Sequence, residues 1–241
     1  MTYNIIFPVL NEEKRLERGV METYRFMEAH AEGPYALTIV DNGSTDRTRE
    51  LATTLCNQHE SIRYIRLDEK GVGIAVKTAI ERNEMDIVGY MDIDLSTGLP
   101  YLEKAVEIFR SDPSVKMVNA SRYGKESRLV GRKWYRVLTG RGFAFLLKFF
   151  LGMKATDGIC GFKFWRKEVA AELIKACSHE NGWFYIVEML LRTERKGYKI
   201  AELPVVWVDD GANTTVHVKK QICVYLRNIR RLRKVFSAED C

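Results

Sequence analysis

The stretch DIVGYMDIDLSTG, residues 86–98, begins as an apolar run and ends in two aspartates one residue apart. Residues 86–91 have the length and composition of a buried strand. Carboxylates are costly to bury without a partner, so Asp92 and Asp94 either lie outside the core as solvated turn residues or hold something positive. The fold decides between these alternatives, because it determines which side chains lie beside the two carboxylates.

Strand-like and helical segments alternate through the first half of the 241-residue chain. This alternation predicts βαβ units, and therefore an α/β fold with a mainly parallel central sheet and helices on both faces. We expect one domain over residues 1–210 and a basic amphipathic helix over residues 211–241. Five segments of the first half have strand patterns: residues 3–7, 35–41, 61–67, 86–91 and 115–121.

Polar clusters follow four of these strands. The carboxyl ends of parallel strands meet at one edge of a sheet, where ligands bind, so we expect the clusters to converge. In an extended segment, residues two apart point the same way, and a pair of carboxylates such as Asp92 and Asp94 suits Mg²⁺ or Mn²⁺. Ser96 would lie near this metal or cap the next helix. The clusters are PVLNEE (8–13), DNGSTD (41–46), DIDLS (92–96) and SRYGKES (121–127).

The net charge of +6 is distributed unevenly. Residues 122–154 contain nine Lys/Arg and one Glu, and residues 217–235 contain seven Lys/Arg and no acid. Such segments indicate an anionic partner, either a phosphorylated ligand, a membrane surface or nucleic acid, unless they are simply solvated faces. Apolar residues recur at helical spacing over 216–236, a pattern typical of a helix at a membrane interface, although packing on the domain is an alternative. The aromatic segment 143–151 is a second candidate for membrane contact.

Several classes of protein are disfavoured. The five cysteines form no C-x-x-C pair, which argues against a zinc site or a disulfide framework. A nucleic-acid partner is not expected, because the acidic edge would repel a phosphate backbone. No uncharged apolar run approaches the ~20 residues that cross a bilayer, and the first residues lack a signal-peptide pattern. We therefore expect a cytoplasmic protein, peripheral to a membrane.

The motifs PVLNEE, VDNGSTD, GVGIAVKTAI and DIDLS, in this order, resemble those of inverting GT-A glycosyltransferases of family 2, which use nucleotide sugars. In the second half, SRYGKES, RKWYR, GFAFLLKFFLG, DGICGFKFWRKEVA and PVVW are similar to the polyprenyl-phosphate branch. Within that branch, the dolichyl-phosphate glucosyltransferases are most similar and the mannosyltransferases next. The resemblance implies a Rossmann-like GT-A fold.

The resemblance also implies a reaction. A metal-dependent enzyme would transfer a hexose to dolichyl or polyprenyl phosphate, for glycan or N-glycosylation precursors, with Mg²⁺ or Mn²⁺ as cofactor. UDP-glucose is the favoured donor and GDP-mannose the alternative. The resemblance is also compatible with a partner subunit in the membrane. No general base is needed, since a phosphate monoester, with a second pKa near ~6, is largely dianionic at neutral pH. The non-enzymatic alternative is a basic α/β module that binds nucleic acid or a membrane.

The resemblance further implies roles by position. The metal would be held by Asp92, Asp94 and Ser96. The acceptor phosphate would lie at Arg122, Arg136 and Gly140, and catalysis would rest on Asp94, Arg122 and Arg136. The donor would be bound by Pro8, Leu10, Glu12, Asp41, Asn42, Gly71, Lys77, Asp92 and Ile93.

Overall fold

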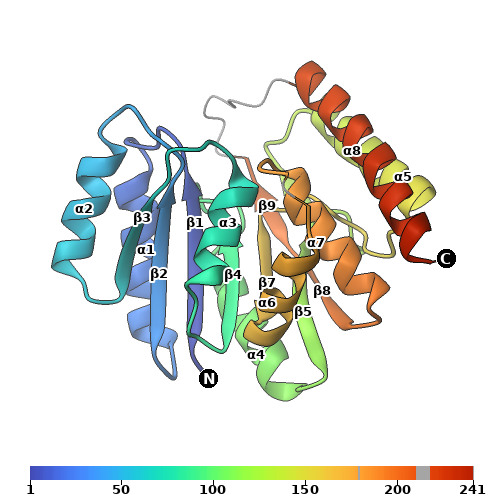
Figure 1. Cartoon of the computed structure of the whole chain (residues 1–241). Helices are drawn as coiled ribbons and strands as arrows, with labels where there is room; N and C mark the ends of the chain where they lie inside the picture. Colours follow the sequence, from blue (N-terminus) through green and yellow to red (C-terminus); the bar gives the residue numbers. More distant parts are fainter. Residues whose placement is uncertain (179, 210–217, 241) are drawn as a thin grey trace.

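A seven-stranded sheet forms the centre of the molecule in the computed structural model, which describes residues 1–178, 180–209 and 218–240 (Figure 1). The strand order is β3-β2-β1-β4-β7-β5-β8, and six strands point the same way while β7 runs antiparallel to both its neighbours. The mainly parallel α/β fold expected from the sequence is therefore confirmed. The strands are β1 (Tyr3–Val9), β2 (Tyr35–Asp41), β3 (Ile62–Arg66), β4 (Ile87–Met91), β5 (Val115–Ser121), β7 (Phe162–Arg166) and β8 (Lys199–Pro204).

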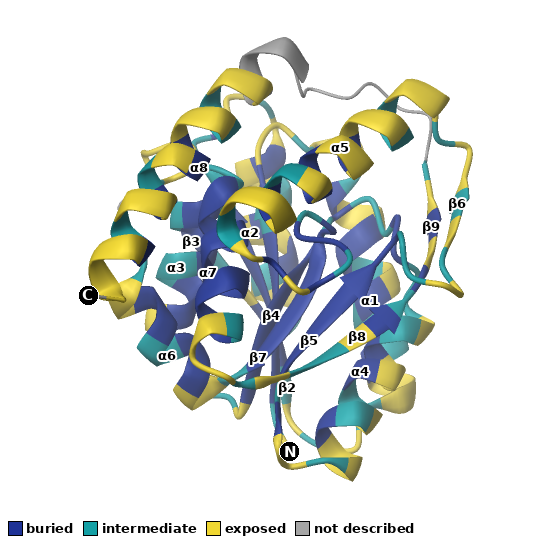
Figure 2. Cartoon of the chain, turned by 90° about the vertical axis from the view of Figure 1, so that its right-hand side faces the viewer, coloured by how far each residue is buried: buried dark blue, intermediate teal, exposed yellow. Residues whose placement is uncertain are grey.

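Helices cover both faces of the sheet, and each face has its own apolar cluster. Successive strand residues point to opposite faces, so Ile5 and Phe7 of β1 pack into one cluster and Ile6 packs into the other. The first cluster is closed by α1 (Leu16–His30), α2 (Thr48–Gln58) and α4 (Pro100–Ser111). The second is closed by α3 (Val72–Glu81), α6 (Lys167–Ala176) and α7 (Phe184–Arg195). Figure 2 shows the central strands buried between these layers, whereas the edge strand β8 is mostly half-buried or exposed.

Two further helices lie side by side at one end of the molecule, α5 (Trp134–Leu151) and α8 (Val218–Glu239) (Figure 1). The expected C-terminal amphipathic helix is present as α8. Its second half packs on the domain through Ile229, Leu232 and Phe236, whereas Ile222 and Leu226 are exposed. Residues 211–217 of the predicted C-terminal segment lie outside the described residues, and the division at residue 210 stays a prediction. No helix of the described chain has the length and hydropathy to span a membrane.

The small strands β6 (Arg128–Val130) and β9 (Val206–Val208) pair in parallel beyond the carboxyl edge of the main sheet. Thr97, in the loop after β4, forms an isolated antiparallel bridge with Trp207 of β9. This bridge ties the segment that follows the two aspartates to β9, which follows β8 and pairs with β6 in the segment after β5. The polar loops after β4 and β5 are therefore held against each other.

Two glycines allow the reversed strand β7 to approach β4 closely. A Cβ atom on Gly89 would lie 2.3 Å from the carbonyl oxygen of Lys163 and equally close to the Phe164 ring. At the end of the same pair, a Cβ atom on Gly161 would lie 2.0 Å from Oδ2 of Asp92. Side chains at these positions would push β7 away from β4, so the glycines determine how closely the loop before β7 reaches Asp92.

We predict that Gly89→Ala destabilises the protein by about 1–3 kcal/mol, because the added methyl group overpacks the contact between β4 and β7. Gly142→Ala is the matched control. Gly142 is an exposed residue of α5 with no atom within 4 Å of an added Cβ. This control should be neutral or stabilise by up to about 1 kcal/mol, since alanine favours a helix. Urea unfolding measures both changes, and equal stabilities would contradict the close approach.

Candidate active site

The two aspartates of the opening stretch lie in a tight turn at the carboxyl end of β4. The backbone N–H of Leu95 donates to the carbonyl of Asp92 at 3.1 Å, and Leu95 has a φ of 58°. The N–H of Ser96 donates to Oδ1 of Asp94 at 2.9 Å. The spacing argument from the sequence assumes an extended segment here. The structure has a turn instead, so that assumption is wrong. The turn, and not strand alternation, brings the two carboxylates together.

The carboxylate of Asp92 has no ion-pair partner within 4 Å among the residues that the structure describes. Burial raises the pKa of Asp92 to about 7, and the neighbouring Asp94 charge adds to this, while Arg122 and Lys163 offset part of it. No hydrogen bond reaches this carboxylate from any residue that the structure describes. The hydroxyl oxygen of Ser96 is buried beside the turn and likewise has no hydrogen-bond partner. These unpaired oxygens fit a hard divalent cation, which would favour the charged form of Asp92.

The set of protein ligands is small. Over the described ranges, no group of three or more His, Cys, Asp or Glu is placed to hold a metal ion. Two carboxylates and a hydroxyl are still enough for Mg²⁺ or Mn²⁺, which usually keep several waters and complete their coordination with substrate phosphates. The residues present therefore fit such an ion and do not fit a closed structural metal site.

Unpaired polar atoms are concentrated at this edge of the sheet. Five buried side-chain polar atoms lack a hydrogen-bond partner in the part of the chain that the structure describes, and four of them lie in loops at or beyond the carboxyl edge. Buried polar groups are nearly always hydrogen-bonded in folded proteins, so these atoms have hydrogen-bonding capacity left for a polar ligand or for water. The four atoms are Asn42 Oδ1, Ser96 Oγ, Tyr123 Oη and Arg132 Nε.

The loop after β2 holds two of the predicted donor residues. Asp41 is fully buried and accepts hydrogen bonds from the Ser44 N–H at 2.8 Å, the Tyr64 hydroxyl at 2.9 Å and Arg66 Nη1 at 2.8 Å. Most of its hydrogen-bonding capacity is therefore used within the protein. Asn42 donates to the Val9 carbonyl from its backbone and its side chain, but its Oδ1 is unpaired. Of the two, Asn42 has the freer acceptor atom.

The loop after β1 lies beside these residues. Glu12 forms a bidentate ion pair with Arg15, both contacts being 2.8 Å, and its charge contributes to the raised pKa of Asp92. Pro8 is half-buried at the end of β1, and Leu10 is exposed just beyond it. Ile93 is buried, and its carbonyl packs against Gly19 of α1. The structure thus brings Pro8, Leu10, Glu12, Asp41, Asn42, Asp92 and Ile93 to one edge of the sheet.

The remaining predicted donor residues, Gly71 and Lys77, lie at α3. Gly71 has a φ of 149° and packs against the backbone of Asn181. The N–H groups of Gly73 and Ile74, at the start of this helix, both donate to the Asn181 carbonyl. Lys77 lies one turn further along, with Nζ 3.9 Å from the Glu81 carboxylate. These contacts show no approach to the acidic turn, so a donor role for Gly71 and Lys77 stays a prediction.

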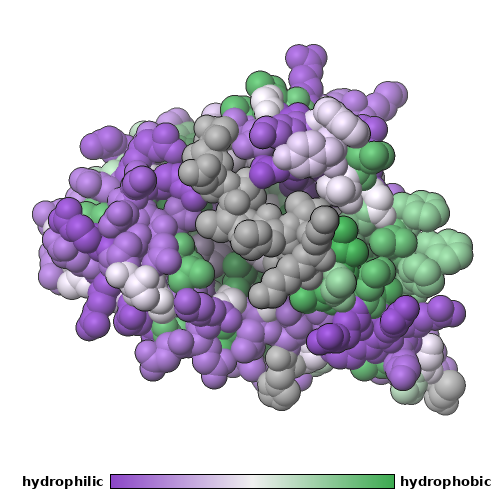
Figure 3. All heavy atoms as spheres, turned by 90° about the horizontal axis from the view of Figure 1, so that it is seen from above, coloured by the Kyte–Doolittle hydropathy of each residue, from purple (hydrophilic) through white to green (hydrophobic). Residues whose placement is uncertain are grey.

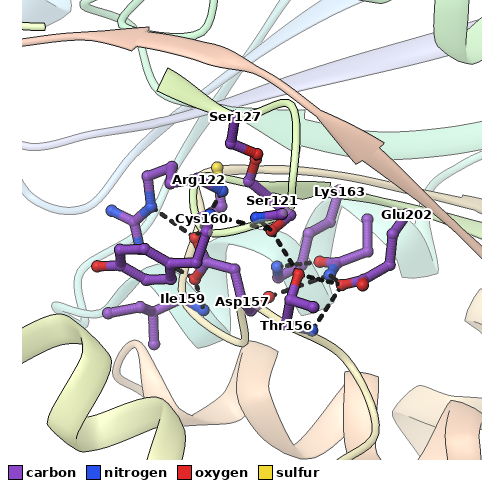
Figure 4. Close-up of polar contacts among 12 residues, drawn as sticks. Ser121, Arg122, Ser127, Thr156, Asp157, Ile159, Cys160, Lys163 and Glu202 are labelled. Atoms are coloured by element: carbon purple, nitrogen blue, oxygen red, sulfur yellow. Dashed lines mark hydrogen bonds and ion pairs between the residues drawn. The ribbon is translucent and has the colours of Figure 1, made fainter. Parts of the chain in front are cut away.

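A buried ion pair follows β5 (Figure 4). Arg122 donates to Asp157 through Nε at 2.7 Å and Nη2 at 3.0 Å, and its backbone N–H also reaches this carboxylate at 3.2 Å. Burial is the largest single effect and alone would raise the pKa of Asp157, but the charge and hydrogen bonds of Arg122, together with Lys163 and the Ile159 N–H, lower it on balance. Burial would likewise lower the pKa of Arg122, yet Asp157 raises it well above its usual value. Both shifts favour the charged forms of the two groups.

Polar contacts hold the loop that carries Asp157. Glu202 of β8 accepts hydrogen bonds from the Thr156 N–H at 2.7 Å and the Thr156 hydroxyl at 2.9 Å, and the Asn119 amide donates to the Asp157 carbonyl at 3.0 Å. Lys163 of β7 is fully buried and donates to the Asn119 side chain (Figure 4). Its pKa is lowered by burial. Strands β5, β7 and β8 therefore position Asp157 jointly.

The other predicted acceptor residues lie on the first two turns of α5. Arg136 is half-buried, with Nη1 3.7 Å from Asp209. Gly140 is buried, and a Cβ atom there would lie 2.1 Å from the Tyr123 hydroxyl oxygen. The structure thus places Arg122, Tyr123 and Gly140 next to one another. Arg136 lies one helical turn before Gly140.

Sequence reasoning did not assign roles to Asp157, Tyr123, Arg132 or Trp207. The guanidinium carbon of Arg132 lies 4.7 Å from the centre of the Trp207 ring, and that of Arg122 lies 5.8 Å from the same ring. Trp207 is thus shared by the arginines and, through its bridge to Thr97, by the acidic turn. The motifs that contain these residues are visible in the sequence, but only the fold shows that they meet.

Relatives with known names are similar to this chain in sequence. The profile of the family described as Glycosyl transferase family 2 matches residues 4–174. Glycosyltransferase AglD of Haloferax volcanii is 31% identical over 221 residues, which are 91% of this chain but 35% of AglD. The human dolichyl-phosphate beta-glucosyltransferase is 28% identical over 219 residues, which are 86% of this chain and 67% of the human protein. The chain therefore spans only part of each relative.

Solved structures show the same architecture. Glucosyl-3-phosphoglycerate synthase from Mycobacterium tuberculosis, in complex with Mn²⁺ and UDP-glucose, matches with a TM-score of 0.68 at 20% identity, covering 96% of this chain and 77% of that one. Its complex with Mn²⁺, UDP and glucosyl-3-phosphoglycerate matches with a TM-score of 0.67 at 19% identity, covering 93% and 76%. Identity this low supports a shared GT-A fold alone. Since the family profile covers most of the chain, the chain belongs to glycosyl transferase family 2 and is a glycosyltransferase of the GT-A fold.

Proposed function

We propose that this enzyme transfers a hexose from a nucleotide sugar, UDP-glucose being favoured, to dolichyl or polyprenyl phosphate with inversion at the anomeric carbon. One observation carries the proposal. An acidic turn, whose Asp92 carboxylate and Ser96 hydroxyl have no hydrogen-bond partner among the described residues, lies at the same edge of the sheet as an arginine cluster that includes Arg122 and Arg132. The first suits a cation on a diphosphate and the second a phosphate acceptor. The named dolichyl-phosphate relatives and the Mn²⁺- and UDP-glucose-bound neighbours support the same assignment.

In this proposal the acidic half binds the donor. Asp92 and Asp94 hold Mg²⁺ or Mn²⁺, with the Ser96 hydroxyl close by; when bound, the ion neutralises charge on the diphosphate. Asn42 uses its unpaired Oδ1 to accept a hydrogen bond from the base. Glu12, held by Arg15, accepts hydrogen bonds from the ribose hydroxyls.

The basic half binds and orients the acceptor. Arg136, together with Nη1 of Arg122, holds the phosphate, and Gly140 keeps the helix close to it. One phosphate oxygen forms a bond to the anomeric carbon from the face opposite the diphosphate, and the bond from that carbon to the diphosphate breaks. The nucleoside diphosphate leaves. The acceptor is already dianionic, so no side chain has to remove a proton, and positioning together with electrostatics supplies the catalysis.

We predict that Asp94→Asn lowers transfer from UDP-glucose to a polyprenyl phosphate by at least about 100-fold, because it removes one of two carboxylates that face the diphosphate. The assay measures radiolabelled lipid-linked sugar, with a panel of UDP- and GDP-sugars as donors. The exposed Asp68→Asn serves as the matched control. Near-wild-type activity of Asp94→Asn would contradict the metal assignment, and preference for GDP-mannose would replace the favoured donor by the alternative one.

The raised pKa of Asp92 predicts a pH-dependent stability. The unfolded carboxyl titrates near ~3.9, so between this pH and about 7 the folded protein keeps a proton that the unfolded chain has lost. Without divalent ions, the free energy of unfolding therefore falls as pH rises through this window. Asp92→Asn should be more stable than wild type at pH 8 by about 1–4 kcal/mol, and equal to it near pH 4.

Urea unfolding in EDTA measures this difference, and a second series with Mn²⁺ supplies the control. Mn²⁺ should stabilise the wild type more at pH 8 than at pH 6, because protonation of Asp92 competes with the ion, and it should not stabilise Asp92→Asn. A variant that is less stable than wild type at pH 8 in EDTA would show that Asp92 is not a strained carboxylate.

The proposal also gives the enzyme a membrane surface on which to meet its lipid acceptor. Four large apolar residues of α5, here called the aromatic face, are strongly exposed: Trp134, Leu138, Phe145 and Phe149. Their spacing puts them on one side of the helix, with exposed Arg141 and Lys148 beside them. Seen from above, apolar side chains gather at the end of the molecule where α5 and α8 lie (Figure 3). Exposed aromatics flanked by basic residues suit an anionic cytoplasmic leaflet.

We predict that the triple variant Leu138→Ser, Phe145→Ser and Phe149→Ser loses at least about 10-fold in affinity for anionic vesicles, because each exposed apolar side chain contributes to insertion. Sedimentation with vesicles of phosphatidylcholine and phosphatidylserine measures it. Val206→Ser, which changes an exposed valine of β9, is the control, and thermal melts check that the triple variant is folded. Unchanged vesicle binding would contradict a role for α5 in binding the membrane.

A further inference from the structure

Arg132 and Tyr123 present buried polar atoms that neither the fold nor the roles assigned above explain. Arg132 lies between β6 and α5, and its Nε is buried without a hydrogen-bond partner, as is the hydroxyl oxygen of Tyr123. In the chain as described, Arg132 forms no ion pair within 4 Å; its guanidinium stacks on Trp207. Arg122 differs, because two of its three nitrogens are bonded to Asp157. Arg132 therefore has more unused donors than Arg122.

The charges around Arg132 are not balanced. Burial lowers the pKa of Arg132, and the positive charges of Arg122 and Arg136 lower it further, while Asp209 opposes them. Arg122 and Arg141 also flank the ring of Tyr123, at 5.4 and 5.8 Å from its centre. Three guanidinium groups, those of Arg122, Arg132 and Arg141, thus lie against the rings of Tyr123 and Trp207. Asp157 is already bonded to Arg122, and Asp209 lies 3.7 Å from Arg136.

The start of α5 adds to the positive potential beside Arg132. This 18-residue helix has no side-chain cap and no acidic residue in its first turn, and Lys133 occupies the N-cap position. The free N–H groups of a helix N-terminus attract anions. An anion placed between Arg132 and Arg136 would meet these groups together with two guanidinium side chains.

We propose that Arg132 and Tyr123 bind the acceptor's phosphate monoester, alongside Arg136 and Nη1 of Arg122, and that they set the preference for a monoester over a diester. This inference rests on the proposed function and deepens it. Nε and Nη of Arg132 form a planar fork that suits two phosphate oxygens, and the Tyr123 hydroxyl donates to a third. A dianionic monoester gains more than a monoanionic diester from an additional guanidinium charge.

Steady-state kinetics with UDP-glucose and farnesyl phosphate test the assignment. Arg132→Gln should raise the KM for farnesyl phosphate by roughly 10- to 100-fold and leave the KM for UDP-glucose unchanged. Arg132→Lys should restore part of the loss, and Tyr123→Phe should show a smaller rise, roughly 3- to 10-fold. The control is Arg128→Gln, which removes an exposed arginine of neighbouring β6 and should change neither constant.

Calorimetry with inorganic phosphate and with farnesyl phosphate gives a readout that does not need catalysis. Wild type should bind farnesyl phosphate more tightly than inorganic phosphate, and Arg132→Gln should weaken both. Equal binding of the two ligands would overturn the assignment to a lipid acceptor.

The failure of this inference can be told from the failure of the proposed function. If wild type transfers sugar to farnesyl phosphate but Arg132→Gln keeps a normal acceptor KM, or raises the donor KM instead, the Arg132 site is overturned and the function stands. If wild type transfers nothing to prenyl phosphates, the function fails. In that case, phosphate binding that depends on Arg132 would still support the anion site, and binding that does not depend on it would overturn the site as well.

Discussion

The buried ion pair between Arg122 and Asp157 is the interaction on which the active-site edge depends. It joins the end of β5 to the loop before β7, the one strand of the main sheet that runs against its neighbours. Replacing a buried ion pair by apolar residues is often neutral for stability, whereas removing one partner leaves an uncompensated charge. The pair is therefore better understood as a device that fixes geometry: with Asp157 held, Gly161 meets Asp92 at the end of β4.

The same constraint explains why opposite charges can share one edge without neutralising each other. Arg122 is bonded to Asp157, so it only partly offsets the raised pKa of Asp92. Trp207 is bridged to the loop after Asp94 and lies against the guanidinium groups of Arg122 and Arg132. An aromatic ring can accept cations on its face without cancelling their charge. The acidic turn and the arginine cluster can thus lie close together without neutralising each other's charge.

Much of the fold follows from the sequence because alternating strand and helix patterns are local signals. The same signals place PVLNEE, DNGSTD, DIDLS and SRYGKES at one edge, as observed. The reversed direction of β7 is not encoded locally, since FKFWR is compatible with either direction, and the partnership of Asp157 with Arg122 depends on it. Periodicity also misjudged the turn at Asp92, where Leu95 adopts a positive φ. Contacts between residues distant in sequence are what the sequence leaves undetermined.

Asp92 and Arg132 have pKa values that are shifted in opposite directions in the protein without ligands. The pKa of Asp92 is raised and that of Arg132 is lowered, so each charge is less stable in the fold than in water. Both would be relieved by a ligand of opposite sign, and a single ligand of one sign would relieve only one of them. Under the proposed function, a sugar passes from a cation-bound diphosphate to a phosphate, so the site would need a carboxylate for the cation and a guanidinium for the phosphate at the same edge of the sheet. If the proposed donor and acceptor bind here, stability given up at these two positions is recovered as binding free energy.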